Sequence, residues 1–271
     1  MNRALCIGIN DYPGTNSDLN GCVNDAYDWA SELQKRGFIT TTILDGQCSK
    51  ANMIYQIQKI ISEARPGDIT VITYSGHGTW VPDTSGDEDD GRDEGLCPWD
   101  ISKGQILLDD ELDKLFRAIQ PGAKLVFISD SCHSGTVSRG FLPWDKHQHP
   151  VGDDCISETV NKRYLDTQEF LTDDIMNKGW KTSPSINLSD DVAVFFSGCS
   201  DIEYSYDANF NGKANGAFTY VALNALKVLP EDATYEDWYN EIRKTLPQAR
   251  YPQTPKFSGT DTQRNWKIFK I

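Results

Sequence analysis

The sequence predicts an α/β protein whose central sheet is mainly parallel. Two observations predict this fold class. Short apolar runs alternate with segments of helical periodicity, and several of these runs lack the polar alternation of a half-exposed strand. Of the 271 residues, 38% are hydrophobic and 24% are charged, which is a globular composition. A chain of this length buries enough surface for a substantial core.

The first predicted elements lie near the N-terminus. Ala4–Ile9 is a short apolar run typical of a buried strand. Asp25–Gln34 has apolar residues at helical spacing, and Gly37 stands where a C-cap is expected. Phe38–Leu44 is rich in isoleucine and threonine, which favours a second strand.

The next unit repeats the alternation of helix and strand. Ser49 is the expected N-cap of a helix over Ala51–Ala64, whose core side carries isoleucine and methionine. A turn at Pro66-Gly67-Asp68 leads into Ile69–Tyr74, a continuous apolar run typical of a strand covered on both faces.

Two long polar segments interrupt this alternation. Val81–Lys103 is acidic and rich in turn residues, so we expect an exposed loop. A helix over Asp110–Ile119 and a central strand over Lys124–Ser129 follow it. Phe141–Ser189 is polar and irregular, with a weakly helical stretch at Tyr164–Met176, and predicts a surface excursion.

The C-terminal part returns to the α/β pattern. Val192–Ser197 predicts a further apolar strand, and Ala217–Leu229 and Tyr235–Leu246 have helical periodicity. The alternating segment Trp266–Ile271 predicts a final strand.

Charge and cysteine usage restrict the partners and the compartment. The formal net charge of −14 disfavours nucleic acid and anionic membranes and favours cations or basic substrates. The sequence has neither a recognisable secretory signal nor a run of apolar residues long enough to span a membrane. Its seven cysteines form no CxxC pair, which predicts free thiols in a reducing, cytoplasmic environment.

Two polar motifs follow directly after predicted central strands, Ser75-Gly76-His77-Gly78 and Asp130-Ser131-Cys132-His133-Ser134-Gly135. Because the carboxyl ends of parallel strands meet at one sheet edge, we expect His77 and Cys132 to lie close together. An imidazole can accept the proton of a thiol and later protonate an amine leaving group. The backbone amides of Gly78 and Cys132 are candidates to bind the oxyanion.

Each motif alone has a plainer explanation. A single cysteine after a strand usually packs as a small core residue, and SGHG can form a tight turn. Together, after two strong strands, they favour catalysis. His133 follows Cys132 directly and is expected to point away from it, so His77 is the predicted base. No third residue that would orient the imidazole is evident from the sequence.

This pair of motifs resembles the caspase-like cysteine peptidases, specifically the metacaspase and orthocaspase branch. Cys132 follows His77 by 55 residues, close to the roughly 50 expected between the caspase histidine and cysteine. The resemblance runs from Leu5 to about Gly135 and resumes over Val192–Ala225. It implies that Cys132 is the nucleophile and His77 the general base.

The resemblance also implies the architecture. We expect a caspase-like three-layer sandwich forming a single catalytic domain over residues 1–271. A large-subunit-like segment would span 1–140, a linker 141–190 and a small-subunit-like segment 191–271. Relatives of this kind resemble monomers more than obligate dimers, so we expect a monomer.

The residues around the nucleophile predict a basic substrate. Side chains two apart on an extended segment point the same way, which places Asp130 beside Cys132 and Ser75 beside His77. A carboxylate there repels aspartate and attracts arginine or lysine. The resemblance implies a pocket for Arg or Lys built from Asp130, Ser75 and Asp25. Taken alone, Asp25 is also explained as an acid at a helix N-terminus. The predicted partners are protein or peptide substrates with Arg or Lys at the cleaved bond.

The acidic loop raises the question of calcium. Its residues do not fit an EF-hand, and a solvated charged loop is the simpler explanation. The resemblance implies a Ca²⁺ site that draws on Asp93, Asp109 and Asp110, with calcium as an activator. Arg139 stands where the family has a fourth ligand, so calcium dependence is an open question at this point.

The resemblance further implies a zymogen that cuts its own linker, but the sequence does not single out one of the basic residues there. Two alternatives stay open. One is a clostripain- or legumain-like peptidase with a different pocket. The other is a catalytically silent caspase-like scaffold that acts through calcium or a partner.

Overall fold

The structure is a computed structural model, and it describes residues 1–82, 92–132, 161–166, 169–170, 193–200 and 203–270. Its central sheet has the strand order β12-β9-β7-β3-β1-β2. The parallel strands are β1 (Arg3–Gly8), β2 (Ile39–Leu44), β3 (Ile69–Ser75), β7 (Lys124–Asp130) and β9 (Val194–Ser197). The edge strand β12 (Lys256–Ser258) is antiparallel to β9. Every residue of β3 is buried, as its continuous apolar run predicts.

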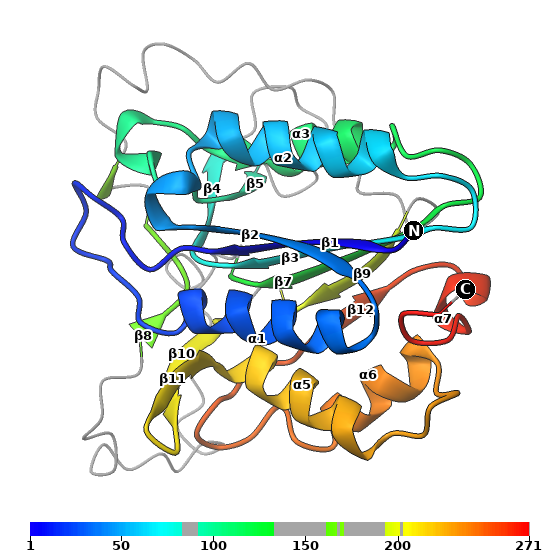
Figure 1. Cartoon of the computed structure of the whole chain (residues 1–271). Coiled ribbons are helices and arrows are strands. Elements are labelled where there is room, and N and C mark those ends of the chain that lie inside the picture. The colour runs from blue at the N-terminus through cyan, green and yellow to red at the C-terminus, as the bar shows by residue number, and fades with distance from the viewer. Residues whose placement is uncertain (83–91, 133–160, 167–168, 171–192, 201–202, 271) are drawn as a thin grey trace.

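Helices cover both faces of this sheet, which confirms the predicted fold class (Figure 1). On one face lie α2 (Lys50–Glu63) and α3 (Asp109–Phe116). On the other lie α1 (Cys22–Lys35), α5 (Ala217–Val228) and α6 (Tyr235–Arg243). Shorter helical segments are α7 (Asp261–Arg264) and the 3₁₀ turns Asp45–Gln47 and Ile101–Lys103. Ser49 caps α2, as predicted, by accepting a hydrogen bond from the Asn52 amide.

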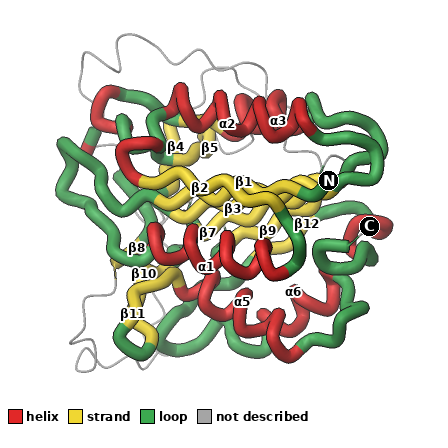
Figure 2. The backbone as a smooth tube through the Cα atoms, in the orientation of Figure 1, coloured by secondary structure: helices red, strands yellow, loops and turns green. Residues whose placement is uncertain are grey.

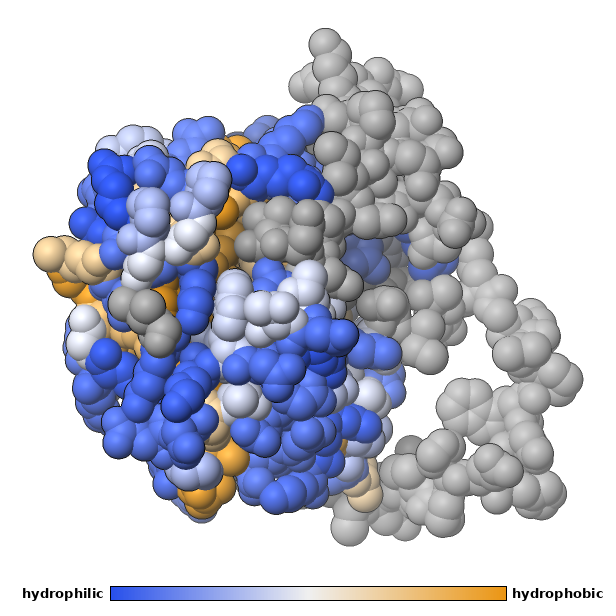
Figure 3. Space-filling model, turned by 90° about the vertical axis from the view of Figure 1, so that its right-hand side faces the viewer, coloured by the Kyte–Doolittle hydropathy of each residue, from blue (hydrophilic) through white to orange (hydrophobic). Residues whose placement is uncertain are grey.

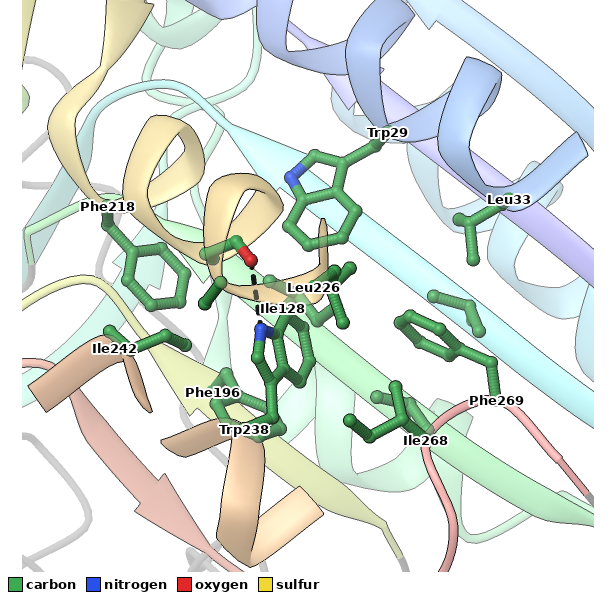
Figure 4. Packing of buried hydrophobic residues seen from close by; sticks show 14 of the residues in the cluster. Trp29, Leu33, Ile128, Phe196, Phe218, Leu226, Trp238, Ile242, Ile268 and Phe269 are labelled. Atoms are coloured by element: carbon green, nitrogen blue, oxygen red, sulfur yellow. Dashed lines mark hydrogen bonds between the residues drawn. The ribbon is translucent and has the colours of Figure 1, made fainter. Parts of the chain in front are cut away.

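The sheet separates two buried clusters, because successive residues of a strand face opposite sides. In β1, Cys6 belongs to the cluster on the α1 side and Leu5 to the cluster on the α2 side. The α1-side cluster contains Trp29, Trp238 and Phe196 (Figure 4). The indole nitrogen of Trp238 donates to a backbone carbonyl of α5 at 2.9 Å, so this buried polar atom is satisfied.

Two small antiparallel sheets lie beside the main one, as the tube in Figure 2 traces. One contains β4 (Gly78–Pro82), β5 (Arg92–Leu96) and β6 (Leu107–Leu108). The other contains β8 (Asn161–Lys162), β10 (Tyr206–Phe210) and β11 (Lys213–Gly216).

Three expectations from the sequence are corrected here. The Val81–Lys103 segment is not all loop, because pairing with β4 satisfies the backbone of β5 despite its polar composition. Trp266–Ile271 does not form the last strand: turn structure follows α7, and β12 takes the sheet edge instead. The described residues of Tyr164–Met176 contain no α-helix, and Arg163 and Leu165 are fully buried rather than on a surface excursion.

All the cysteines among the described residues are free thiols, and Cys155 lies outside those residues. No helix within the described ranges is long and apolar enough to cross a membrane. On the face turned to the viewer in Figure 3, hydrophilic residues dominate and apolar ones form small separate groups, as the composition suggests.

Candidate active site

The two motifs meet at the carboxyl edge of the sheet, as predicted. Strands β3 and β7 are neighbours, and their register pairs Ser75 with Asp130. Two residues beyond each of these positions stand His77 and Cys132, with exposed fractions of 2% and 0%. The sheet topology therefore places both candidate catalytic residues at the same buried level of the molecule.

The His77 ring is held by the loop that follows β1. Its Nε2 lies 2.5 Å from the carbonyl oxygen of Ser17, which requires a proton on Nε2. Tyr12 packs its ring 4.7 Å from the imidazole and accepts a hydrogen bond from the His77 amide. Burial lowers the pKa of His77 to about 4, so the ring is neutral at pH 7. The Nδ1 atom, which accepts no hydrogen bond from the described residues, then carries the free lone pair.

Arg163 lies directly against both motifs. Its carbonyl oxygen accepts hydrogen bonds from the amides of Gly78 and Cys132, at 3.0 and 3.2 Å. These two amides are the ones predicted as candidates to bind the oxyanion. The Arg163 amide donates to the carbonyl of Ser205 at 2.9 Å, and the Ser205 amide hydrogen-bonds the Cys132 thiol.

The Arg163 side chain fills a pocket lined by three carboxylates. Its guanidinium lies 2.7 Å from Asp25, 3.2 Å from Asp130 and 3.0 Å from Asp207, and all four side chains are at most 3% exposed. Arginine presents a planar fork of donors that matches such acceptors. Ser75 lies beside Asp130 on the neighbouring strand and is also buried.

Each carboxylate is oriented by further donors. Asp130 accepts from the Thr219 amide and hydroxyl at 2.8 and 2.7 Å, and Asp25 accepts from the Asn215 side chain at 2.8 Å. Burial, together with the charge of Asp130, raises the pKa of Asp25 to about 7, although Arg163 opposes this shift. The wall at Gly216 is glycine for a steric reason, since a Cβ there would collide with Asp130 and Arg163.

Sequence reasoning missed three parts of the site: Asp207, Arg163 as the occupant of the pocket, and the Ser17 carbonyl that holds His77. The position of Asp207 could have been predicted from the sequence. It opens the β10–β11 hairpin, whose turn at Asn211-Gly212 is the strongest short-range hairpin signal in a sequence. The other two depend on contacts between distant segments.

The residues predicted to bind calcium lie on β5, the strand next to β4, and at the start of α3. Asp93 in β5 is 2% exposed and Asp110 in α3 is 6% exposed. The pairing of Gly95 with Leu108 directs Asp93 and Asp109–Asp110 toward the same end of their small sheet. Carboxylate oxygens are the donors that calcium takes, so these residues fit the ion chemically.

The predicted calcium site extends beyond what is described. Arg139 and most of the acidic loop lie outside the described residues. Within the described ranges, no group of three or more histidine, cysteine, aspartate or glutamate side chains is arranged to hold a metal ion.

Comparison with solved structures identifies the fold. The fold is caspase-like: caspase-1 from Spodoptera frugiperda superimposes with a TM-score of 0.59 at 11% identity, over 95% of this chain and 86% of that one. A crystal structure of protein GSU0716 from Geobacter sulfurreducens gives a TM-score of 0.73 at 30% identity, over 100% of this chain and 98% of the other.

Sequence comparison gives the family. Residues 2–139 match the metacaspase peptidase C14 domain. Metacaspase-1 of Meyerozyma guilliermondii is 31% identical over 96% of this chain, and Metacaspase-1 of Cryptococcus neoformans var. neoformans serotype D is 32% identical over 95%. The chain spans 70% and 62% of the length of these two relatives. It belongs to the metacaspase family of caspase-like cysteine peptidases.

Proposed function

We propose that this protein is a cysteine endopeptidase that cleaves after arginine or lysine. One observation carries the proposal: an arginine of the chain itself occupies a buried pocket of three carboxylates while its carbonyl oxygen binds two backbone amides. An aspartate side chain at this position would bring a further negative charge into the field of Asp25, Asp130 and Asp207 and would be too short to contact them. Like charges in a buried site repel strongly, which disfavours cleavage after aspartate.

The chemistry follows from the atoms around that carbonyl. The Cys132 sulfur attacks the carbonyl carbon as its proton passes to Nδ1 of His77. The developing negative charge on oxygen is stabilised by the amides of Gly78 and Cys132. His77 then gives the proton to the leaving amine as the peptide bond breaks. Water hydrolyses the resulting thioester and regenerates the thiol. The Ser17 carbonyl acts as the orienting group, because it fixes the proton on Nε2 and leaves Nδ1 basic.

Paired fluorogenic peptides test this proposal. Four peptides that differ only in the residue before the coumarin, namely Arg, Lys, Gln and Asp, are assayed with the full chain. We expect cleavage after Arg and Lys, and kcat/KM for Asp lower by about 10³ or more. Preferred cleavage after Asp would contradict the pocket assignment and leave the peptidase chemistry standing.

We further propose that the bond between Arg163 and Tyr164 is cut by the enzyme itself. Nothing in the sequence distinguishes Arg163 from its basic neighbours. Lys162, the residue before it, rests its ammonium over the Tyr204 ring at 4.0 Å, outside the acidic pocket. In the uncut chain Arg163 excludes any other substrate from the pocket, so self-cleavage and departure of the segment would be the activating events.

Self-cleavage makes a defined prediction for the products. Intact-mass spectrometry of the incubated protein is expected to give fragments 1–163 and 164–271. Arg163→Gln removes the charge and leaves the chain uncut, whereas Arg163→Lys slows cutting by about tenfold because lysine lacks the planar fork. Arg250→Gln, at an exposed arginine, serves as the control and is expected to cut normally. A cut at another basic residue in wild type would overturn the assignment.

We also propose that calcium stimulates this activity through Asp93, Asp109 and Asp110. Support comes from their donor chemistry and from the burial of Asp93 and Asp110 at one end of the β5–β6 pair. In the structure as described these side chains do not form a group arranged around an ion, so the proposal requires them to converge when calcium binds. A bound cation would neutralise buried carboxylates beside β4, the strand that begins with the carbonyl-binding Gly78. We also propose that the protein is a monomer, which sedimentation would test. Its proposed substrates are proteins or peptides with Arg or Lys at the cleaved bond.

Calcium removal is therefore expected to lower kcat/KM on the Arg peptide, and calcium but not magnesium is expected to restore it. Asp110→Asn should raise the half-maximal calcium concentration by about tenfold, because ligand charge sets affinity in such sites. Asp261→Asn, at an exposed aspartate, is the matched control. Equal activity in calcium and in chelator would remove the ion from the proposal.

A further inference from the structure

The chain continues past Arg163 as an extended segment that remains bound to β4. The Leu165 amide donates to the carbonyl of Gly78 at 3.0 Å, and the Thr79 hydroxyl donates to the carbonyl of Leu165 at 2.8 Å. Gly78 and Tyr164 also form a parallel bridge. The Leu165 side chain is 0% exposed and belongs to the buried cluster that contains Val81.

We propose that this position is an apolar subsite for the second residue after the cleaved bond. The inference rests on the proposed function and adds a second specificity to it: beside a basic residue before the bond, the enzyme selects a leucine-like residue two positions after it. The ligand chemistry is an aliphatic side chain carried on an extended peptide.

The backbone geometry makes this a property of the site and not only of one leucine. Gly78 donates its amide to the Arg163 carbonyl and accepts from the Leu165 amide with its own carbonyl. One glycine therefore fixes both the carbonyl to be attacked and the residue two positions beyond it. Any extended substrate whose carbonyl sits on the Gly78 amide brings its second following residue to the same place.

The side-chain directions agree with this. In an extended segment, residues two apart point to the same side, and Arg163 and Leu165 both point into the protein with no exposed surface. Tyr164, between them, is only half-buried and lies 6.0 Å from the ring of Tyr204. The subsite is thus a buried apolar position on the same side of the extended chain as the acidic pocket, whereas Tyr164 between them is partly exposed.

A peptide series tests the subsite with the full, self-processed chain. Internally quenched peptides containing Lys-Arg-Tyr-Leu are compared with peptides carrying Asn or Asp in place of that Leu. We expect the Leu peptide to have a roughly tenfold or higher kcat/KM, since Leu and Asn have the same side-chain branching and differ chiefly in the cost of burial. The same Leu→Asn change two residues further along is the peptide control and is expected to alter kcat/KM less than twofold. Equal kcat/KM for the Leu and Asn peptides overturns the subsite.

Two further measurements separate this inference from the proposed function. A peptidyl-Arg coumarin has no residue after the bond, so its cleavage reports the Arg pocket and chemistry alone; failure on it removes both proposals together. Thr79→Val is expected to lower the ratio of kcat/KM for the quenched Leu peptide to that for the coumarin by about fivefold. Thr41→Val, on the edge strand β2, is the matched control. An unchanged ratio in Thr79→Val would overturn the role of the Thr79 hydroxyl.

Discussion

Cys132→Ala is expected to abolish peptide cleavage and to leave the chain as a single uncut species. The variant removes the sulfur that forms the covalent intermediate. Loss of a catalytic nucleophile typically costs about 10⁶ in kcat. The measurement is kcat/KM on the Arg peptide, together with intact mass after prolonged incubation.

Cys6→Ala is the matched control, because it removes an equally buried thiol from β1 in the body of the sheet. We expect it to keep cleavage within a few-fold. Residual turnover by Cys132→Ala at the wild-type rate would show that another group carries the chemistry. A wild-type chain that cleaves neither peptide nor itself would favour the alternative of a silent scaffold.

Asp130→Asn is expected to lower kcat/KM for Arg peptides by about 10² to 10³ and to slow self-cleavage to a similar degree. Asparagine has nearly the same shape, so the change removes the charge from a carboxylate that lies 3.2 Å from the guanidinium and is 1% exposed. Breaking one side of a buried ion pair costs about 3–5 kcal/mol. Asp25 and Asp207 remain to hold part of the charge, which favours the lower end of that range.

The informative readout is selectivity rather than rate alone. The ratio of kcat/KM for an Arg peptide to that for a neutral citrulline peptide isolates the charge, because the two side chains have similar shape. We expect this ratio to fall in Asp130→Asn and to stay unchanged in Asp232→Asn, at an exposed aspartate far along the chain. An unchanged ratio in Asp130→Asn, with the fold intact by thermal melting, would show that the carboxylate does not recognise the substrate charge.

Local sequence was sufficient for the parts of this protein that depend on local patterns. The buried strand β3 follows from an apolar run, and the cap at Ser49 follows from one side chain and the helix after it. The positions of His77 and Cys132 at the sheet edge could be predicted because each residue follows a strong central strand. Neighbouring parallel strands end at the same edge, so the predicted secondary structure was enough to bring these two residues together.

Tertiary structure decided which segments complete the site. Asp25, Asp130 and Asp207 come from α1, β7 and β10, and the contact between Asp25 and Arg163 alone joins residues 138 positions apart. The same holds for β12, which takes the sheet edge that the alternation of Trp266–Ile271 had suggested for the C-terminus. An arginine in a polar segment has the same local signature whether it is solvated or buried. Only packing supplies the carboxylates that offset its desolvation, and for that reason sequence predicted a pocket for arginine but not the arginine that fills it.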